Sequence, residues 1–158
     1  MVKQTFPATA SSTCSLCNAT AFRKASRRLT QFYDEALASS GLRSTQLAVL
    51  AALEQWQAPA PSLAELAQSL VMDRSSLGHT LRPLERDGLI LLQEGDEDRR
   101  QRHIVLTVPG KAKLRQAKQL WLAAQERFDA IFGKAEAAHL RTTLLAIANE
   151  ERLGQLDE

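Results

Sequence analysis

The segment 73–82, DRSSLGHTLR, concentrates hydrogen-bond donors at helical spacing. If Leu77, Leu81 and Leu84 turn into a core, the opposite helix face keeps only donors and small residues, without a carboxylate. That face carries Arg74, Ser75, Gly78, His79 and Arg82, with Ser76 and Thr80 at its margins. Arg and His reach base edges and phosphates, Ser and Thr adapt to either, and glycine lets a backbone approach a groove. Any solvated helix face is polar, but this composition favours a helix that reads DNA.

A second charged segment, EGDEDRRQRHIVLT at 94–107, places acids before arginines. Most such runs only solvate a hairpin turn. Here Asp98 adjoins Arg99 and Arg100, so its carboxylate can orient one guanidinium while the other extends as a donor fork. An arginine at a hairpin tip suits the narrow, negative minor groove of A·T-rich DNA. We expect Arg99 or Arg100 to enter that groove and Asp98 to position it.

Catalysis has little support in the sequence. Ser75, His79 and Asp73 imitate a triad, but Asp73 is better explained as a helix cap, and a short exposed helix offers no oxyanion hole. The three histidines show no metal-ligand spacing. We therefore expect a protein that is not an enzyme and that binds no cofactor and no metal.

Caps and apolar periods predict the elements that hold these segments. Apolar positions three and four residues apart predict a helix over 16–38, and Ser44 is expected to cap a second helix. Ser62-Leu63-Ala64-Glu65 is a capping box for a short third helix over about 62–69. Asp73 is a good N-cap for the fourth helix, which Gly88 ends.

Two strands are predicted at 89–93 and 103–107, with the charged segment as their hairpin loop. Pro109 begins a long fifth helix to about 132, and a sixth helix follows Gly133. Two short helices followed by a hairpin form a winged helix-turn-helix. The expected fold is mostly α with a small β-hairpin wing.

Composition agrees with a globular protein of this size. The chain has 158 residues, of which 44% are hydrophobic and 24% charged, and a net charge of +2. Binding to a polyanion must therefore depend on where the cations cluster. Because the N-terminus has no apolar signal segment and no stretch is long enough to span a bilayer, we expect a cytoplasmic protein without a membrane segment.

These segments together resemble the MarR family of winged helix-turn-helix transcriptional regulators. The run Asp98-Arg99-Arg100, with Val105-Leu106-Thr107 and Gly110, is similar to the family's wing signature. Met72-Asp73-Arg74 and Leu84 to Leu89 are similar to its recognition helix and exit, and Tyr33 to Leu50 to its join between the first two helices. The resemblance covers about residues 16–150.

The resemblance implies a homodimer on a palindromic double-stranded DNA operator, most commonly as a repressor. It implies one domain over 14–158 after a flexible lead-in, 1–13, with dimerisation helices in 14–38 and 109–158 and a DNA-binding lobe over 42–108. Half-sites are expected about 10 bp apart. The candidate DNA contacts are Ser44, Thr45, Ser62, Arg74, Ser75, Ser76, His79, Thr80, Arg82, Asp98, Arg99, Arg100 and Arg102.

The fifth helix has a heptad-like seam that independently predicts a partner. Its apolar positions alternate in steps of three and four: Leu114, Ala117, Trp121, Ala124, Phe128 and Ile131. Packing within one chain is the competing interpretation, although so long a helix extends beyond a small lobe.

Relatives of this kind commonly release DNA on sensing a small aromatic acid, a phenol or an oxidant. We expect a ligand cavity where the first, second and fifth helices meet, with Cys17, Thr20, Arg23 and Leu47 as candidate effector residues. The basic row that includes Arg23 is more commonly a solvated face.

Cys14 and Cys17 share one helix side and leave three interpretations open. Their thiols could oxidise, four thiolates of a dimer could meet around zinc, or both could be small apolar residues without a function.

A winged-helix module that binds protein instead of DNA is a further alternative for the whole chain, but it would not need an arginine-tipped wing.

Overall fold

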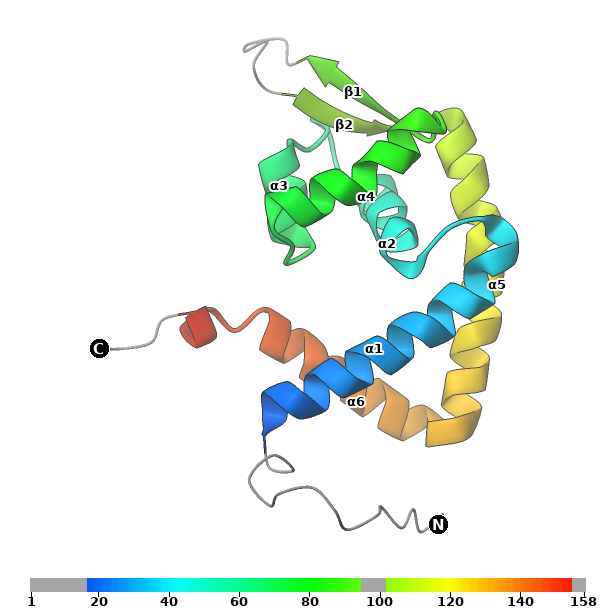
Figure 1. Ribbon diagram of the computed structural model, residues 1–158, viewed down its shortest axis with the longest axis vertical. Coiled ribbons are helices and arrows are strands. Elements are labelled where there is room, and N and C mark those ends of the chain that lie inside the picture. Colours follow the sequence, from blue (N-terminus) through cyan, green and yellow to red (C-terminus); the bar gives the residue numbers. More distant parts are fainter. Residues whose placement is uncertain (1–16, 95–101, 155–158) are drawn as a thin grey trace.

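The computed structural model describes residues 17–94 and 102–154, and the predicted fold class is confirmed (Figure 1). The helix-turn-helix and wing elements are α2 (Ser44–Gln55), α3 (Leu63–Ser69), α4 (Arg74–Arg86), β1 (Ile90–Glu94) and β2 (Arg102–Leu106). The remaining helices are α1 (Asn18–Leu37), α5 (Val108–Phe132) and α6 (Lys134–Ala148), with short 3-10 turns η2 (Ala38–Ser40) and η3 (Glu151–Gly154). No described helix is long and apolar enough to cross a membrane.

The elements α2 to β2 form one lobe, and α5 runs from this lobe to the part of the molecule built by α1 and α6 (Figure 1). A single apolar core joins the lobe to the ends of α1 and α5. Its fully buried members are Leu37, Val49, Leu50, Leu66, Leu77, Leu84, Ile90, Ile104, Leu114 and Ala117. The predicted inward turn of Leu77, Leu81 and Leu84 is therefore confirmed. This packing fixes the opposite face of α4 toward solvent.

Local caps begin the helices largely as the sequence predicts. Ser62 accepts from Glu65 N at 3.3 Å and donates to the Glu65 carboxylate, which completes the capping box. Thr107 precedes α5 and its hydroxyl accepts from Gly110 N at 3.0 Å. The prediction for Ser44 was wrong: Arg43 occupies the N-cap position and Ser44 is the first residue of α2. The Ser44 hydroxyl instead donates a hydrogen bond to the Asp34 carboxylate on α1, ten residues earlier in the chain.

The hairpin pairs antiparallel, from Ile90 opposite Leu106 to Glu94 opposite Arg102, one residue displaced from each predicted strand. The segment before α3 extends this pairing. Ile104 N donates to the Pro61 carbonyl at 2.9 Å, and His103 Nδ1 lies 2.7 Å from the Ala60 carbonyl oxygen. Because a carbonyl only accepts, His103 carries a proton on Nδ1 here. The base of the wing is thus tied to the start of α3.

The seam of α5 divides into two halves. Leu114 and Ala117 belong to the core, so packing within one chain accounts for the first half. Further along, Ala124 is buried but Trp121 and Ile131 remain exposed, at 37% and 63%. The second half of the seam is covered only in part by this chain.

Candidate functional site

The start of α4 is held by Asp73. Its carboxylate accepts from Ser76 N at 2.8 Å and from the Ser76 hydroxyl at 2.6 Å, and these hydrogen bonds lower the pKa of Asp73. Thr80 in turn donates its hydroxyl to the Ser76 carbonyl at 3.0 Å. The Ser76 and Thr80 hydroxyls, both candidate DNA contacts, are therefore already used as donors within α4.

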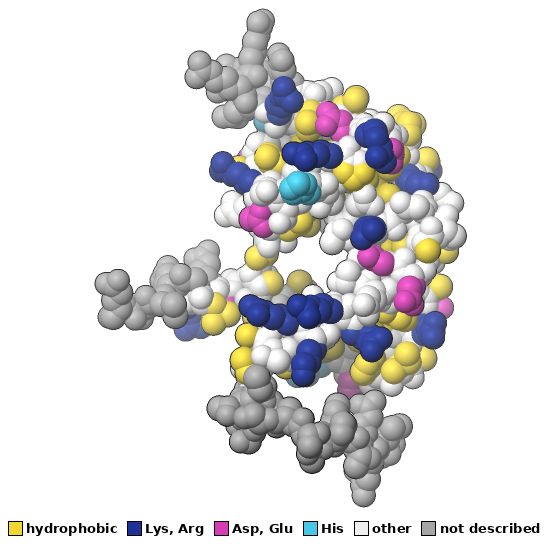
Figure 2. Space-filling model, viewed as in Figure 1, with side chains coloured by type: hydrophobic (Ala, Val, Ile, Leu, Met, Phe, Trp, Pro, Cys, Tyr) yellow, Lys and Arg dark blue, Asp and Glu magenta, His cyan; other side chains and the backbone are white. Residues whose placement is uncertain are grey.

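The outer face of α4 presents donors that the described residues leave unengaged. Arg74, Ser75, His79 and Arg82 are exposed, and no hydrogen bond or ion pair within the described residues engages their side chains. Figure 2 shows Lys, Arg and His side chains gathered over this part of the lobe. A Cβ built on Gly78 would meet nothing within 4 Å, so packing does not demand a glycine there. The face combines free cations with space for close approach.

The α3 start and the wing base carry further candidates. The Ser62 hydroxyl and backbone hold the Glu65 carboxylate, which lowers the pKa of Glu65, so this hydroxyl is engaged as well. Arg102 opens β2 and is exposed. Asp98, Arg99 and Arg100, the predicted tip of the wing, lie outside the described residues.

Two candidates lie at the start of α2. Ser44 donates both its backbone N–H and its hydroxyl to Asp34 Oδ1, at 2.7 and 2.6 Å. Thr45 is exposed beside it. Ser44 is thus a structural link between α1 and α2 in this structure.

A pocket of about 490 Å³ lies between α1, α2 and α5, where the sequence places the effector cavity. Leu47, Ala48 and Ala51 form an apolar wall with Trp121 and Leu122, and Tyr33, Ser44, Gln55 and Lys118 add polar groups. Among the described lining residues, Lys118 carries the one formal charge. Size, apolar walls and a single cation fit a small aromatic anion. We refer to this cavity as the α1–α2–α5 pocket.

Of the predicted effector residues, only Leu47 lines this pocket. Cys17 precedes α1, and Thr20 and Arg23 lie on its first turns, outside the lining. Lys118 and Trp121 line the pocket but are not among the predicted effector residues, although their spacing of three residues puts them on one side of α5. That spacing beside the apolar seam was the available signal.

The Cys17 thiol is exposed, and hydrogen bonding with the Thr20 side chain and backbone lowers its pKa. Cys14 lies outside the described residues. The described part of the chain holds no group of three or more His, Cys, Asp and Glu side chains placed to bind a metal ion.

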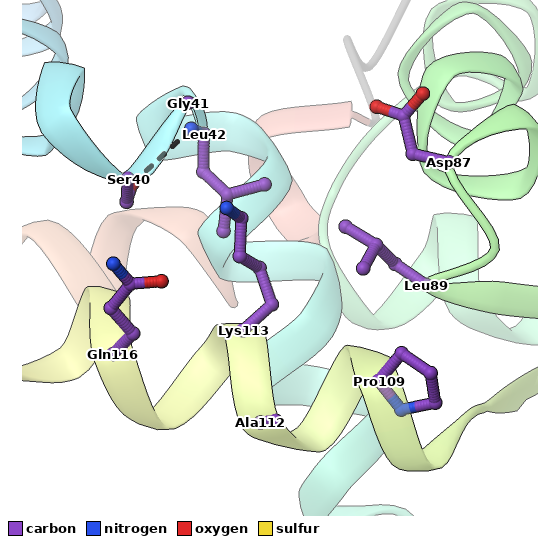
Figure 3. Close-up of a pocket in the computed structure, with 9 residues that line it drawn as sticks. All are labelled: Ser40, Gly41, Leu42, Asp87, Leu89, Pro109, Ala112, Lys113 and Gln116. Carbon is purple, nitrogen blue, oxygen red and sulfur yellow. Dashed lines mark hydrogen bonds between the residues drawn. The ribbon is translucent and has the colours of Figure 1, made fainter.

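A second pocket, of about 550 Å³, lies on another side of α5, where the η2–α2 join meets the exit of α4. Figure 3 shows Lys113 and Gln116 projecting from α5 toward residues 40–42, with Asp87 at the other end. The Arg86 guanidinium lowers the pKa of Asp87, and Lys113 acts in the same direction. None of the predicted site residues lines it.

Comparisons with known proteins identify this arrangement. A model of the MarR family matches residues 42–101. The DNA-bound structure of the Mycobacterium tuberculosis transcriptional regulator MosR is 31% identical, covers 89% of this chain and 99% of its own, and has a TM-score of 0.77. A search of curated proteins gave no match.

CouR of Rhodococcus jostii, a transcriptional repressor, is similar in two states. Bound to a 23-mer DNA duplex it is 27% identical over 87% of this chain and 96% of its own, with a TM-score of 0.78. Bound to p-coumaroyl-CoA it is 25% identical over 88% and 96%, with a TM-score of 0.77.

The DNA-bound relatives argue against a lobe that binds only protein. The match to MosR covers 89% of this chain and therefore spans both the lobe and the long helices. The chain belongs to the MarR family and is a DNA-binding transcriptional regulator of the winged helix-turn-helix type.

Proposed function

We propose that the protein is a homodimeric repressor, released from a palindromic operator when a small aromatic acid or phenol binds the α1–α2–α5 pocket. The observation that carries the proposal is the outer face of α4, with Arg74, His79 and Arg82 exposed and unpaired within the described residues. Residues 42–108 are the DNA-binding lobe, and 14–38 with 109–158 the dimerisation region.

The contacts with DNA divide between the free and the engaged side chains. Arg74, Ser75, His79 and Arg82 reach the major groove and its phosphates, since no described residue engages their donors. Four other hydroxyls already donate hydrogen bonds to protein acceptors: those of Ser44, Ser62, Ser76 and Thr80. These residues shape the surface and, together with Thr45, make secondary contacts with DNA. Arg99 or Arg100 enters the minor groove with Asp98 as its positioner, and Arg102 at the start of β2 is a further DNA contact.

A second copy of this chain covers the apolar surface of the long helices. Most of the large exposed apolar side chains among the described residues lie on α1, α5 and α6: Phe22, Val108, Trp121, Leu122, Ile131, Phe132, Leu140, Leu145 and Ile147. Monomeric proteins rarely leave so extended an apolar surface in water. Two-fold pairing of these helices would bury it and set two lobes on one operator.

The test of DNA recognition begins with in vitro selection of the operator. Gel shifts then compare the wild type with Arg74→Ala and Arg82→Ala. Each substitution is expected to weaken binding about fivefold to a hundredfold. Arg152→Ala, which removes an exposed arginine of η3, is the matched control and should bind normally. Undiminished affinity in both α4 variants would contradict this reading of the face.

The dimer has a separate test. Ile131→Asp places a charge on the exposed α5 seam, and light scattering should show a shift toward monomer. Leu91→Asp is the control, because Leu91 is an exposed apolar residue of β1 in the lobe. A dimer that survives Ile131→Asp would place the interface elsewhere.

Thiol-based sensing is the second candidate, favoured by the exposed Cys17 with its lowered pKa. The thiolate is the nucleophile that attacks peroxide. Mild peroxide should then release DNA from the wild type and modify Cys14 or Cys17 in a mass spectrum. Release without modification of either cysteine would exclude this mechanism.

A further inference from the structure

Lys118 of the α1–α2–α5 pocket is already paired. Its ammonium contacts Glu54 Oε2 on α2, and Glu54 itself does not line the pocket. The two side chains are 41% and 31% exposed, so the pair is half solvated. The one cation among the described lining residues is therefore held by a carboxylate from just outside the pocket.

This ion pair differs from the others in the described part of the chain. Arg86–Asp87 and Arg152–Glu150 join residues at most two positions apart. The Lys118–Glu54 pair instead joins α2, in the DNA-binding lobe, to α5, which leads to α1 and α6. It is a link between the two parts of the molecule that a pocket ligand can reach.

Two of the other polar side chains that line the pocket, Tyr33 and Ser44, are already engaged as hydrogen-bond donors. Gln55 adds a neutral amide, so Lys118 remains the one charged anion site among the described lining residues. The Tyr33 hydroxyl donates to Gln125 Oε1, and the Ser44 hydroxyl donates to Asp34 Oδ1 at 2.6 Å. Because each hydroxyl already donates its one hydrogen bond, it can only accept a hydrogen bond from a ligand. An anionic group entering the pocket has Lys118 as its cation, while a hydroxyl of the same ligand can donate to Tyr33 or Ser44.

We propose that an aromatic carboxylate acts by exchange: its carboxylate replaces Glu54 on Lys118 and breaks the link between α2 and α5. The proposal rests on the function above, because it assigns the effector to the same pocket. The exchange is feasible because a half-solvated ion pair contributes little, whereas the ligand's ion pair forms against apolar walls with less competition from water. Breaking the link favours lobe positions that differ from the one seen here.

The experiment compares aromatic acids with their neutral primary amides, such as 4-hydroxybenzoate and 4-hydroxybenzamide, by Trp fluorescence and calorimetry on the full-length protein. The wild type should bind the acids more tightly than the amides. Glu54→Gln removes the competing carboxylate and should strengthen acid binding about two- to fivefold without changing amide binding. Lys118→Gln should abolish the preference for the acids.

A second measurement reads the link itself. Without ligand, Glu54→Gln should weaken operator binding about two- to fivefold, since it mimics the exchanged state. Glu150→Gln, which breaks an ion pair away from the pocket, is the matched control and should leave both ligand and DNA binding unchanged.

The outcomes separate the two proposals. If acids and amides bind equally in all variants, the exchange is wrong while the pocket remains an effector site. If Glu54→Gln leaves acid affinity unchanged although Lys118→Gln weakens it, Glu54 does not compete and the exchange is again wrong. If neither compound class binds across the panel, the effector part of the proposed function fails together with the exchange.

Discussion

The Asp34 carboxylate of α1 accepts two hydrogen bonds from Ser44, the first residue of α2, from the backbone N–H at 2.7 Å and the hydroxyl at 2.6 Å. The backbone N–H is one of those that a helix start leaves without an intrahelical partner. A residue of α1 therefore completes the start of α2. The relationship also fixes the join between the two helices beside the α1–α2–α5 pocket, which Ser44 lines.

Replacing Asp34 by Ala should destabilise the protein by about 1.5–3 kcal/mol, because both donors of Ser44 lose a charged acceptor in a half-buried place. Urea unfolding followed by circular dichroism measures the change. Glu35→Ala is the control. Glu35 is the exposed neighbour of Asp34 on α1, so removing its carboxylate should change the free energy of unfolding by no more than about 0.5 kcal/mol. If Asp34→Ala and Glu35→Ala lower the free energy of unfolding equally, Asp34 does not have this structural role.

The same pair shows where sequence reasoning stops. Ser62 and Asp73 were predicted as caps because their partners, Glu65 and Ser76, lie three residues away, and local spacing is readable from sequence. Ser44 looked like a similar cap, but its partner lies ten residues back on another helix. A cap that depends on tertiary packing cannot be distinguished by local pattern alone.

The candidate site divides in the same way. The donor face of α4 could be predicted because one helical period separates it from buried leucines. A cavity between the first, second and fifth helices could be predicted, and the α1–α2–α5 pocket lies there. Most of its lining could not be predicted, because Tyr33 and Lys118 come together only when α1, α2 and α5 pack. The tip of the wing, with Arg99 and Arg100, stays a prediction.

Gly110 illustrates a glycine that packing requires. A Cβ at this position would overlap the Leu89 carbonyl oxygen and lie 2.7 Å from Leu106 Cδ1, where the first turn of α5 crosses the base of the hairpin. Gly110→Ala should therefore destabilise the fold by about 1–3 kcal/mol or more, despite the better helix propensity of alanine. Thermal unfolding of this variant measures the effect, and an unchanged midpoint would rule out so tight a contact.

Acid should weaken the start of α4 through Asp73. The Ser76 hydroxyl and N–H lower the pKa of Asp73 from its ordinary 3.8. Because the folded pKa is depressed, this carboxylate stabilises the fold fully above its unfolded pKa, about 3.9, and the contribution is lost as pH falls through the folded pKa. Asp73→Asn keeps a capping oxygen without the charge, so the variant should be less stable than the wild type at pH 6.

The difference in the free energy of unfolding between wild type and Asp73→Asn should decrease as pH falls below about 4. Urea unfolding between pH 6 and pH 2.5 measures it. Ser76→Ala removes the hydroxyl that contributes most to the lowered pKa, and should reduce the pH dependence. If the difference in the free energy of unfolding between wild type and Asp73→Asn stays constant across this range, the Asp73 carboxylate has no lowered pKa.

Gly78 offers a substitution in which stability and DNA binding should move in opposite directions. It lies within α4, and a Cβ there meets no protein atom within 4 Å. Gly78→Ala should thus stabilise the fold by about 0.5–1 kcal/mol, since glycine is costly in a helix interior. If the backbone of α4 approaches the groove as proposed, the added methyl group should nevertheless weaken operator binding. Gel shifts and thermal unfolding of the same preparation measure both effects, and a variant that is more stable and binds DNA as tightly as wild type would show that α4 does not approach DNA at this residue.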